Sequence, residues 1–324
     1  MKSPRAATAF TLLELLVAVS VSLVLAALLF TLISQSLHLW QRTQGRVDTA
    51  ASARLALDFL ERDLQGALHR DDGGRWLAVD ILNSTTAVAG HGWLVAASMK
   101  PGATESLRLT PTDPTDSITT ARFGLSGCWL RFVASNVEAN DVQSTPVVIS
   151  YQLARRPITG AVSASNPAGI RYRLYRTAVS STVTFNMGYD VRAGAYSILS
   201  PNPGSERSAQ AVTSPSNAEA LADDVIDFGV WLYARTPDGS LRRTFPKGAA
   251  HLNHAAPQDD AFPVVADVMM RILTSGGANR LDAIEQGRAV RPPEYVTDAV
   301  WWWAVAEANS RVFTRRIVLQ GGPL

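Results

Sequence analysis

The sequence has little from which disulfides or a strong charge could be built. Its 324 residues include one cysteine, Cys128, so no disulfide can form within the chain, and the apolar run around it predicts a buried thiol. The formal net charge is only +2, which gives no support for a nucleic-acid partner, and none is expected. The balance of 47% hydrophobic and 18% charged residues is typical of a folded chain.

Motifs for catalysis and cofactor binding are missing as well. There is no Walker loop, dinucleotide fingerprint or HExxH motif, and the run 124–128 lacks the second glycine of a nucleophile elbow. The histidines and aspartates of 251–260 could bind a metal, but the composition of this loop favours solvated polar residues. Aspartate pairs at 71–72 and 223–224 favour helix-end and turn roles over calcium binding. We therefore predict a protein that is not an enzyme, with no catalytic residue, metal or cofactor.

What the sequence does have is a strongly apolar N-terminal segment. Residues 1–9, MKSPRAATA, are basic without an acid, and residues 10–33 carry a single charged side chain, Glu14. As a helix, residues 15–33 would be about 28 Å long, close to the ~30 Å thickness of a bilayer core. Basic residues before this span and a large remainder after it predict that the leader lies inside and the remainder outside.

Three interpretations of this segment are open. A secretory signal peptide would have a shorter apolar core, of about 7–15 residues, and a small-residue cleavage site, which residues 20–22 could mimic. A plain single-pass anchor accounts for the hydrophobicity but not for Glu14. The third interpretation accounts for the order of features: a basic leader, a small residue, Phe-Thr-Leu-Leu-Glu and an unbroken apolar helix. This order resembles the class III signal of type IV pilins and type II secretion pseudopilins, the prepilin-type proteins.

The resemblance implies a set of site residues at the N-terminus. A prepilin peptidase in the inner membrane would cut between Ala9 and Phe10 and would methylate the new amino group of Phe10. Glu14 would be the acidic fifth residue of the mature chain. The family usually has glycine before the cut, whereas this sequence has alanine, the next-smallest side chain.

Glu14 also has a physical interpretation. A carboxylate in a bilayer costs several kcal/mol and usually marks function, and a helix N-terminus offsets part of that cost. The resemblance implies that the α-amino group of a neighbouring subunit supplies the rest and so sets the axial register in a filament. The alternative is an interfacial glutamate that reaches the headgroups.

The segment after the apolar span continues the helix. Residues 34–70 contain no proline, so we predict a helix from 10 to 70, about 90 Å long, which stops at Asp-Asp-Gly-Gly. Its apolar residues form two stripes on nearly opposite faces: first Leu37, Trp40, Val47, Ala51 and Leu55, then Ala53, Leu57, Leu60, Leu64 and Leu68. We expect the first stripe to pack against neighbouring subunits and the second to dock on this chain's own sheet. A bent helix that packs on one domain throughout is the alternative.

The remainder, residues 75–324, is predicted to be a β-rich periplasmic head, so the fold class is α+β. Short apolar runs between turn residues predict strands at 76–81, 93–98, 106–110, 128–134, 146–154, 171–178, 225–234, 264–273 and 312–319. A helix is expected at 298–309, and its three tryptophans, 301–303, favour core packing over an interface. The loop 201–219 is expected to be mobile.

Segments along the chain also resemble J-type minor pseudopilins and PilW-like minor pilins, and the length and Ala9 resemble a prepilin-type cassette protein of Verrucomicrobia. These segments include 55–68, 221–228, 262–265 and 313–319. The resemblance implies a structural minor subunit, single-pass in the inner membrane with a periplasmic head, and with other pilins or pseudopilins as partners. A fibre-tip binding or adhesion module and a simple membrane-anchored periplasmic protein remain as alternatives.

Overall fold

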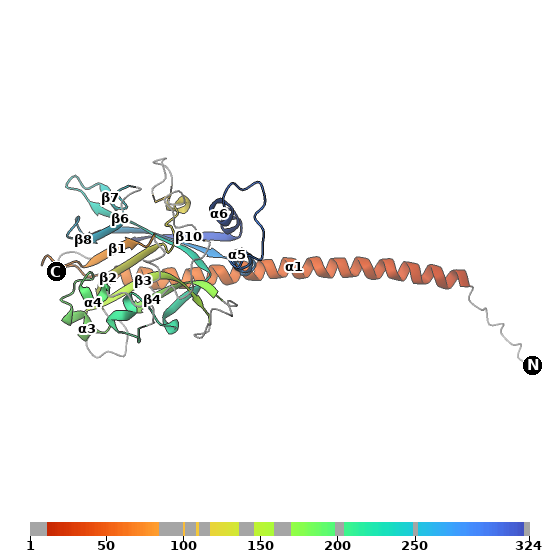
Figure 1. Ribbon diagram of the computed structural model, residues 1–324, viewed down its shortest axis with the longest axis horizontal. Helices are drawn as coiled ribbons and strands as arrows, with labels where there is room; N and C mark the ends of the chain where they lie inside the picture. Colours follow the sequence, from red (N-terminus) through yellow and green to blue (C-terminus); the bar gives the residue numbers. More distant parts are fainter. Residues whose placement is uncertain are drawn as a thin grey trace, which may run out of the picture. The chain divides into compact units, whose positions relative to one another are not determined.

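The computed structural model describes residues 12–83, 100, 108–109, 117–135, 146–158, 170–197, 204–248 and 252–320. The chain divides into two compact units, Met1–Asp48 and Thr49–Leu324. The division falls inside one continuous helix, α1 (Leu12–Gln65), which is red to orange in Figure 1. The fold is α+β, an apolar N-terminal helix followed by a β-rich region.

In the first unit, α1 is apolar and exposed. The stretch Leu12–Leu37 has a mean hydropathy of 2.8 and is the one helix of the described residues that is long and apolar enough to cross a membrane. It includes the span 15–33 expected from the sequence. Its leucines and valines are exposed, and three hydroxyls, including Ser20 and Ser22, donate hydrogen bonds to carbonyls four residues earlier in the helix. These three hydroxyls are thereby satisfied within the helix itself.

In the second unit, the last turns of α1 pack into the core. Ala53, Leu57, Leu60 and Leu64 are buried, whereas Arg54 on the other side is exposed. This burial confirms that the second apolar stripe docks on the chain's own sheet.

The helix ends at Gln65, five residues before the predicted end at Arg70. The reason is that the next backbone groups hydrogen-bond to a strand instead. The amide of Leu68 donates to the carbonyl of Val133 at 2.8 Å, and that of Ser135 donates to the carbonyl of Gly66 at 3.0 Å.

Ten strands of the described residues form two antiparallel sheets (Figure 1). The six-stranded sheet has the order β5 (Ala220–Asp223), β4 (Ile170–Ala178), β3 (Pro146–Pro157), β2 (Cys128–Ser135), β1 (Leu77–Ile81) and β8 (Asn253–Ala256). The four-stranded sheet has the order β10 (Ser310–Val318), β9 (Val265–Leu273), β6 (Val225–Arg235) and β7 (Leu241–Phe245).

Seven of the predicted strands are confirmed as β1, β2, β3, β4, β6, β9 and β10, whereas the short β5, β7 and β8 were not expected. The predicted strand 93–98 and most of 106–110 lie outside the described residues. Two further helices, α5 (Ser275–Glu285) and α6 (Asp298–Ala308), contact each other; α6 confirms the expected helix and α5 was not predicted.

The two sheets share a core with α1. On β3, alternate residues point to opposite faces, and Tyr151 faces the helix and the four-stranded sheet, with its ring centroid 6.4 Å from that of Phe228. Beside it, Gly229 is required because a Cβ there would lie 1.9 Å from the ring of Phe123. Packing this close leaves no room at position 229 for a residue with a side chain.

The other face of the six-stranded sheet is covered by the segment 204–216, which is part of the loop 201–219 that was expected to be mobile; residues 201–203 lie outside the described residues. The segment 204–216 is instead packed on the sheet, since Ala211, Val212 and Ser214 are fully buried. Side chains from the strands hold this segment: the amide of Gln152 donates to the carbonyl of Val212 at 2.8 Å, and Arg156 donates to the Ser214 hydroxyl at 3.1 Å. The polar side chains of β3 thus bind the segment 204–216, which has few apolar side chains of its own.

Four short helices and turns lie in or near this segment of the chain: α3 (Ser181–Asn186), α4 (Gly194–Ser197), η3 (Ala209–Val212) and η4 (Asn217–Glu219). A further 3-10 turn, η2 (Ile118–Thr120), contacts β9 and β10.

Candidate functional site

The N-terminal site predicted from the sequence is described only in part. Ala9 and Phe10 lie outside the described residues. Glu14 lies in the first turn of α1 and is exposed. A carboxylate in this position interacts favourably with the helix dipole.

A buried ionic cluster attaches the end of α1 to the six-stranded sheet. Asp63 accepts hydrogen bonds from the Tyr151 hydroxyl at 2.5 Å and from Arg176, whose Nε and Nη2 lie 2.6 and 3.1 Å from the two carboxylate oxygens. Burial, and next the charge of Asp63, raise the pKa of Tyr151 well above its ordinary value. Two-pronged pairing of this kind fixes the rotation of the helix on the sheet.

A pocket of about 350 Å³ opens on the covered face of the same sheet, at the strands β1, β2 and β8. Its lining includes Asp80, Trp129, Arg131, Arg192 and Asn253. Strand register explains the convergence: Asp80 is paired with Trp129 on one side and with Asn253 on the other, so these side chains share one face.

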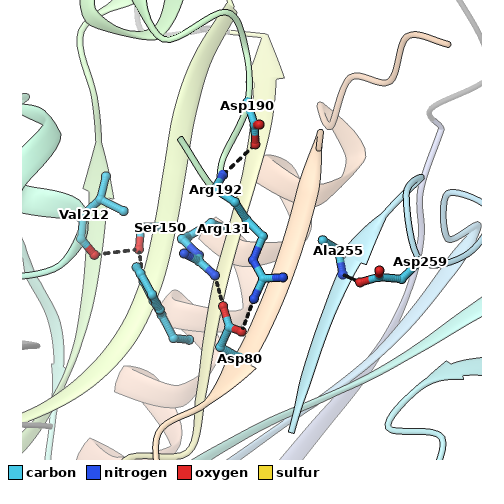
Figure 2. Close-up of polar contacts among 9 residues, drawn as sticks. Asp80, Arg131, Ser150, Asp190, Arg192, Val212, Ala255 and Asp259 are labelled. Atoms are coloured by element: carbon cyan, nitrogen blue, oxygen red, sulfur yellow. Dashed lines mark hydrogen bonds and ion pairs between the residues drawn. The ribbon is translucent and has the colours of Figure 1, made fainter. Parts of the chain in front are cut away.

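Two guanidinium groups converge on Asp80 (Figure 2). Arg131 donates to one carboxylate oxygen, and Nη2 of Arg192 donates to the other at 2.8 Å. Arg192 is itself positioned by its backbone amide, which donates to Asp190 at 2.8 Å. Asp190 also pairs with Arg75 at 3.0 Å. Each oxygen of the Asp80 carboxylate is therefore paired with a guanidinium group.

Arg131 lies between an aromatic ring and this carboxylate. Its guanidinium carbon is 3.3 Å from the centroid of the Trp129 ring, and the indole of Trp129 donates a 3.0 Å hydrogen bond to Ser150. The Ser150 hydroxyl in turn donates to the Val212 carbonyl at 3.3 Å (Figure 2). Burial, and next the charge of Arg192, lower the pKa of Arg131 well below its ordinary value. The buried Nε of Arg131 has no hydrogen-bond partner among the described residues.

The sequence prediction did not include this pocket. Arg131 and Arg192 are 51 and 112 residues from Asp80 along the chain, so no motif joins them. The one local signal was the charged residue Arg131, which lies between apolar residues of strand β2 and therefore needs a buried partner.

Of the residues considered for a metal site, His251 lies outside the described residues, and several of the others have other roles. His254 is buried against Phe245, with ring centroids 6.2 Å apart, which corrects the expectation that this segment is solvated. The carboxylate of Asp259 accepts a hydrogen bond from the Ala255 amide at 2.8 Å (Figure 2). Asp72 accepts from the amide of Gly74 at 2.9 Å, the turn role expected for it. No group of three or more potential metal ligands occurs within the described residues.

Two other expectations concern buried side chains. Trp301, Trp302 and Trp303 are buried, which confirms core packing, and Nε1 of Trp302 donates to Glu285 at 3.0 Å. Cys128 is a buried free thiol, as expected, and burial raises its pKa well above the ordinary value.

Comparison with known proteins gives no relative: no family model matches the sequence, and no match was found among curated proteins or solved structures.

Proposed function

We propose that the chain is a structural subunit of the prepilin type, a minor pilin or pseudopilin held in the inner membrane by its N-terminal helix and assembled through that helix into a filament. The observation that carries the proposal is α1, one helix of 54 residues whose first part is exposed and apolar and whose last turns are buried in the β-rich unit. A simple anchor needs only the first of these two properties.

The apolar stretch Leu12–Leu37 supports a membrane location before assembly. A helix satisfies its own backbone hydrogen bonds, which is the condition for crossing a hydrocarbon layer. Its 26 residues would span about 39 Å, enough for the bilayer core. The remainder of the chain would lie in the periplasm, because the basic leader stays inside.

Apolar side chains beyond the span argue for lateral contacts. Leu37, Trp40 and Val47 are 53%, 66% and 57% exposed. A contiguous exposed apolar surface marks an interaction site. Helices of neighbouring subunits are the partners that would cover this stripe in a filament.

Glu14 would then set the register between subunits. Its carboxylate is placed at the N-terminus of the helix, where a cation from another chain can reach it. In the proposal this cation is the amino group of Phe10 on a neighbouring subunit, which the prepilin peptidase creates by cutting after Ala9 and then methylates. A pair formed in the membrane removes most of the cost of the charge.

Replacement of Glu14 by leucine tests the proposal. We expect Glu14→Leu to insert in the membrane as the parent does, since it adds hydrophobicity, but to be lost from cross-linked filaments in cells. Ser20→Leu is the matched control, because Ser20 is satisfied by the carbonyl of Leu16 at 2.8 Å within its own helix, and it should assemble normally. Equal assembly of Glu14→Leu and the parent would show that the proposal is wrong.

A further inference from the structure

The pocket at Asp80, Arg131 and Arg192 points to a function of the head that membrane anchoring and assembly do not require. We propose that this pocket binds a carboxylate attached to a compact apolar group, with Arg192 as the contact residue and Trp129 and Leu252 forming the apolar wall. The inference concerns the β-rich unit alone, so it holds whether or not α1 assembles into a filament.

The charges of the pocket favour a ligand with one negative charge. Its lining contains two arginines and one aspartate, which leaves one positive charge in excess. The neighbouring Arg75 and Asp190 pair with each other at 3.0 Å and leave this balance unchanged. A singly charged carboxylate would neutralise the site, whereas a doubly charged phosphate would add repulsion with Asp80.

The state of Arg131 supports the same conclusion. Its side chain is 3% exposed, yet its carboxylate partner, Asp80, is shared with Arg192. Because burial and the second arginine lower its pKa, the charged form of Arg131 would gain from a further anion. If a ligand carboxylate paired with Arg192, Asp80 could pair with Arg131 alone. Each arginine would then have a carboxylate of its own.

Arg192 is the group that a ligand can reach. Its side chain is 31% exposed, and its placement is fixed at the backbone by the bond to Asp190. Among the described residues its guanidinium donates one hydrogen bond to Asp80, which leaves further N–H donors on a group that carries five. The planar fork of these donors matches a carboxylate in a two-pronged geometry.

The size and walls of the pocket define the rest of the ligand. A volume of about 350 Å³ lies at the lower end of the range for small-molecule sites. Leu252, which is 37% exposed, lines the pocket together with Trp129, whose ring lies against the guanidinium of Arg131. An aromatic acid fits this description, and so does the C-terminal carboxylate of a peptide with an apolar last residue, because both present the same chemistry.

Binding to the full-length protein in detergent micelles tests the inference. The probes are N-acetylphenylalanine, its uncharged amide, inorganic phosphate and a short peptide that ends in phenylalanine, each titrated by calorimetry. We expect the acid to bind, and the amide and phosphate to bind at least about tenfold more weakly. Peptide binding at least about tenfold tighter than the acid would identify a peptide C-terminus as the source of the carboxylate, and equal binding would identify a small acid.

Matched arginine variants locate the site. Arg192→Gln should weaken binding of the acid at least about tenfold, and Arg192→Lys should weaken it less, because the charge is kept while the fork is lost. Arg316→Gln is the control, since Arg316 is another partly exposed arginine paired with one aspartate, Asp267, on the four-stranded sheet. Unfolding curves establish that the variants are folded. Absence of acid binding, equal binding of acid and amide, stronger binding of phosphate, or an unchanged affinity in Arg192→Gln would each overturn the inference.

Discussion

The two ends of α1 use the same kind of residue in different ways. Leu37 and Leu60 are both leucines on one continuous helix, yet Leu37 is 53% exposed and Leu60 is 0% exposed. Near Leu60 the apolar residues face a sheet of the same chain, and Asp63 adds a buried ionic anchor. Near Leu37 the apolar side chains, such as Leu39 and Trp40, are exposed. Hydrophobicity alone therefore does not define the role of a helical segment. The role depends on which face of the helix carries the apolar residues.

The largest effect is expected from removal of the ionic anchor. Asp63→Ala leaves the guanidinium of Arg176, whose side chain is only 14% exposed, without its carboxylate and should lower the free energy of unfolding of the head by about 3–5 kcal/mol. Denaturant unfolding followed by tryptophan fluorescence measures this. The control is Asp58→Ala on the same helix, whose carboxylate is 55% exposed and pairs with Arg315, and it should cost less than about 1 kcal/mol. Equal effects of the two variants would contradict the assignment of Asp63 as an anchor.

A pair of leucine substitutions compares the two stripes directly. Leu60→Ala should destabilise the head by about 2–5 kcal/mol, because it opens a cavity in a packed core. Leu37→Ala should leave unfolding of the head unchanged but weaken association between subunits, measured by cross-linking in membranes. If Leu37→Ala also destabilised the head, the helix would be packing on one domain throughout.

The alkaline pH dependence of stability should report Tyr151. Because its folded-state pKa is raised, the neutral hydroxyl stabilises the head below the ordinary pKa of about 10, and this contribution is lost as the pH rises further. Tyr151→Phe should lose about 1 kcal/mol of stability at neutral pH with the hydrogen bond to Asp63 and should show a smaller loss above about pH 10. The pKa values of Tyr196 and Tyr233 are also raised, to about 12, and these two tyrosines contribute equally to the pH dependence of the parent and of the variant. Parallel stability curves for parent and variant would contradict the assignment.

The smallest effect is expected at the surface of the same helix. Arg315 bridges Asp58 and Glu61 at 2.6 and 2.7 Å, but both carboxylates are more than a third exposed. Arg315→Ala should therefore change the free energy of unfolding by less than about 1 kcal/mol, and added salt should reduce the difference further. A loss as large as that of Asp63→Ala would mean that the exposed pair, rather than the buried one, fixes the helix.

Some elements could be predicted from the sequence because their own residues determine them. The long strands β3, β6 and β9 are dense in β-branched and aromatic residues, and the second stripe of α1 has helical spacing. The short β8, Asn-His-Ala-Ala, has no such pattern and is a strand only because β1 pairs with it. Likewise α5 begins at Ser275 with two glycines next in the chain, and its burial of Leu281 and Ile284 depends on distant partners.

The pocket and the segment 204–216 could not be predicted for the same reason. The interactions that order this segment come from side chains of β3, such as Gln152 and Arg156, rather than from its own apolar residues. The pocket depends on strand register, which places Asp80 beside Trp129 across two strands. Local sequence patterns do not contain such long-range pairings.

The mass of the mature chain, isolated from membranes of cells that carry a prepilin peptidase, tests the central proposal most directly. We expect a chain that begins at Phe10 and carries one added methyl group on its amino terminus. An intact Met1, or a chain cut after Ser22, would contradict it.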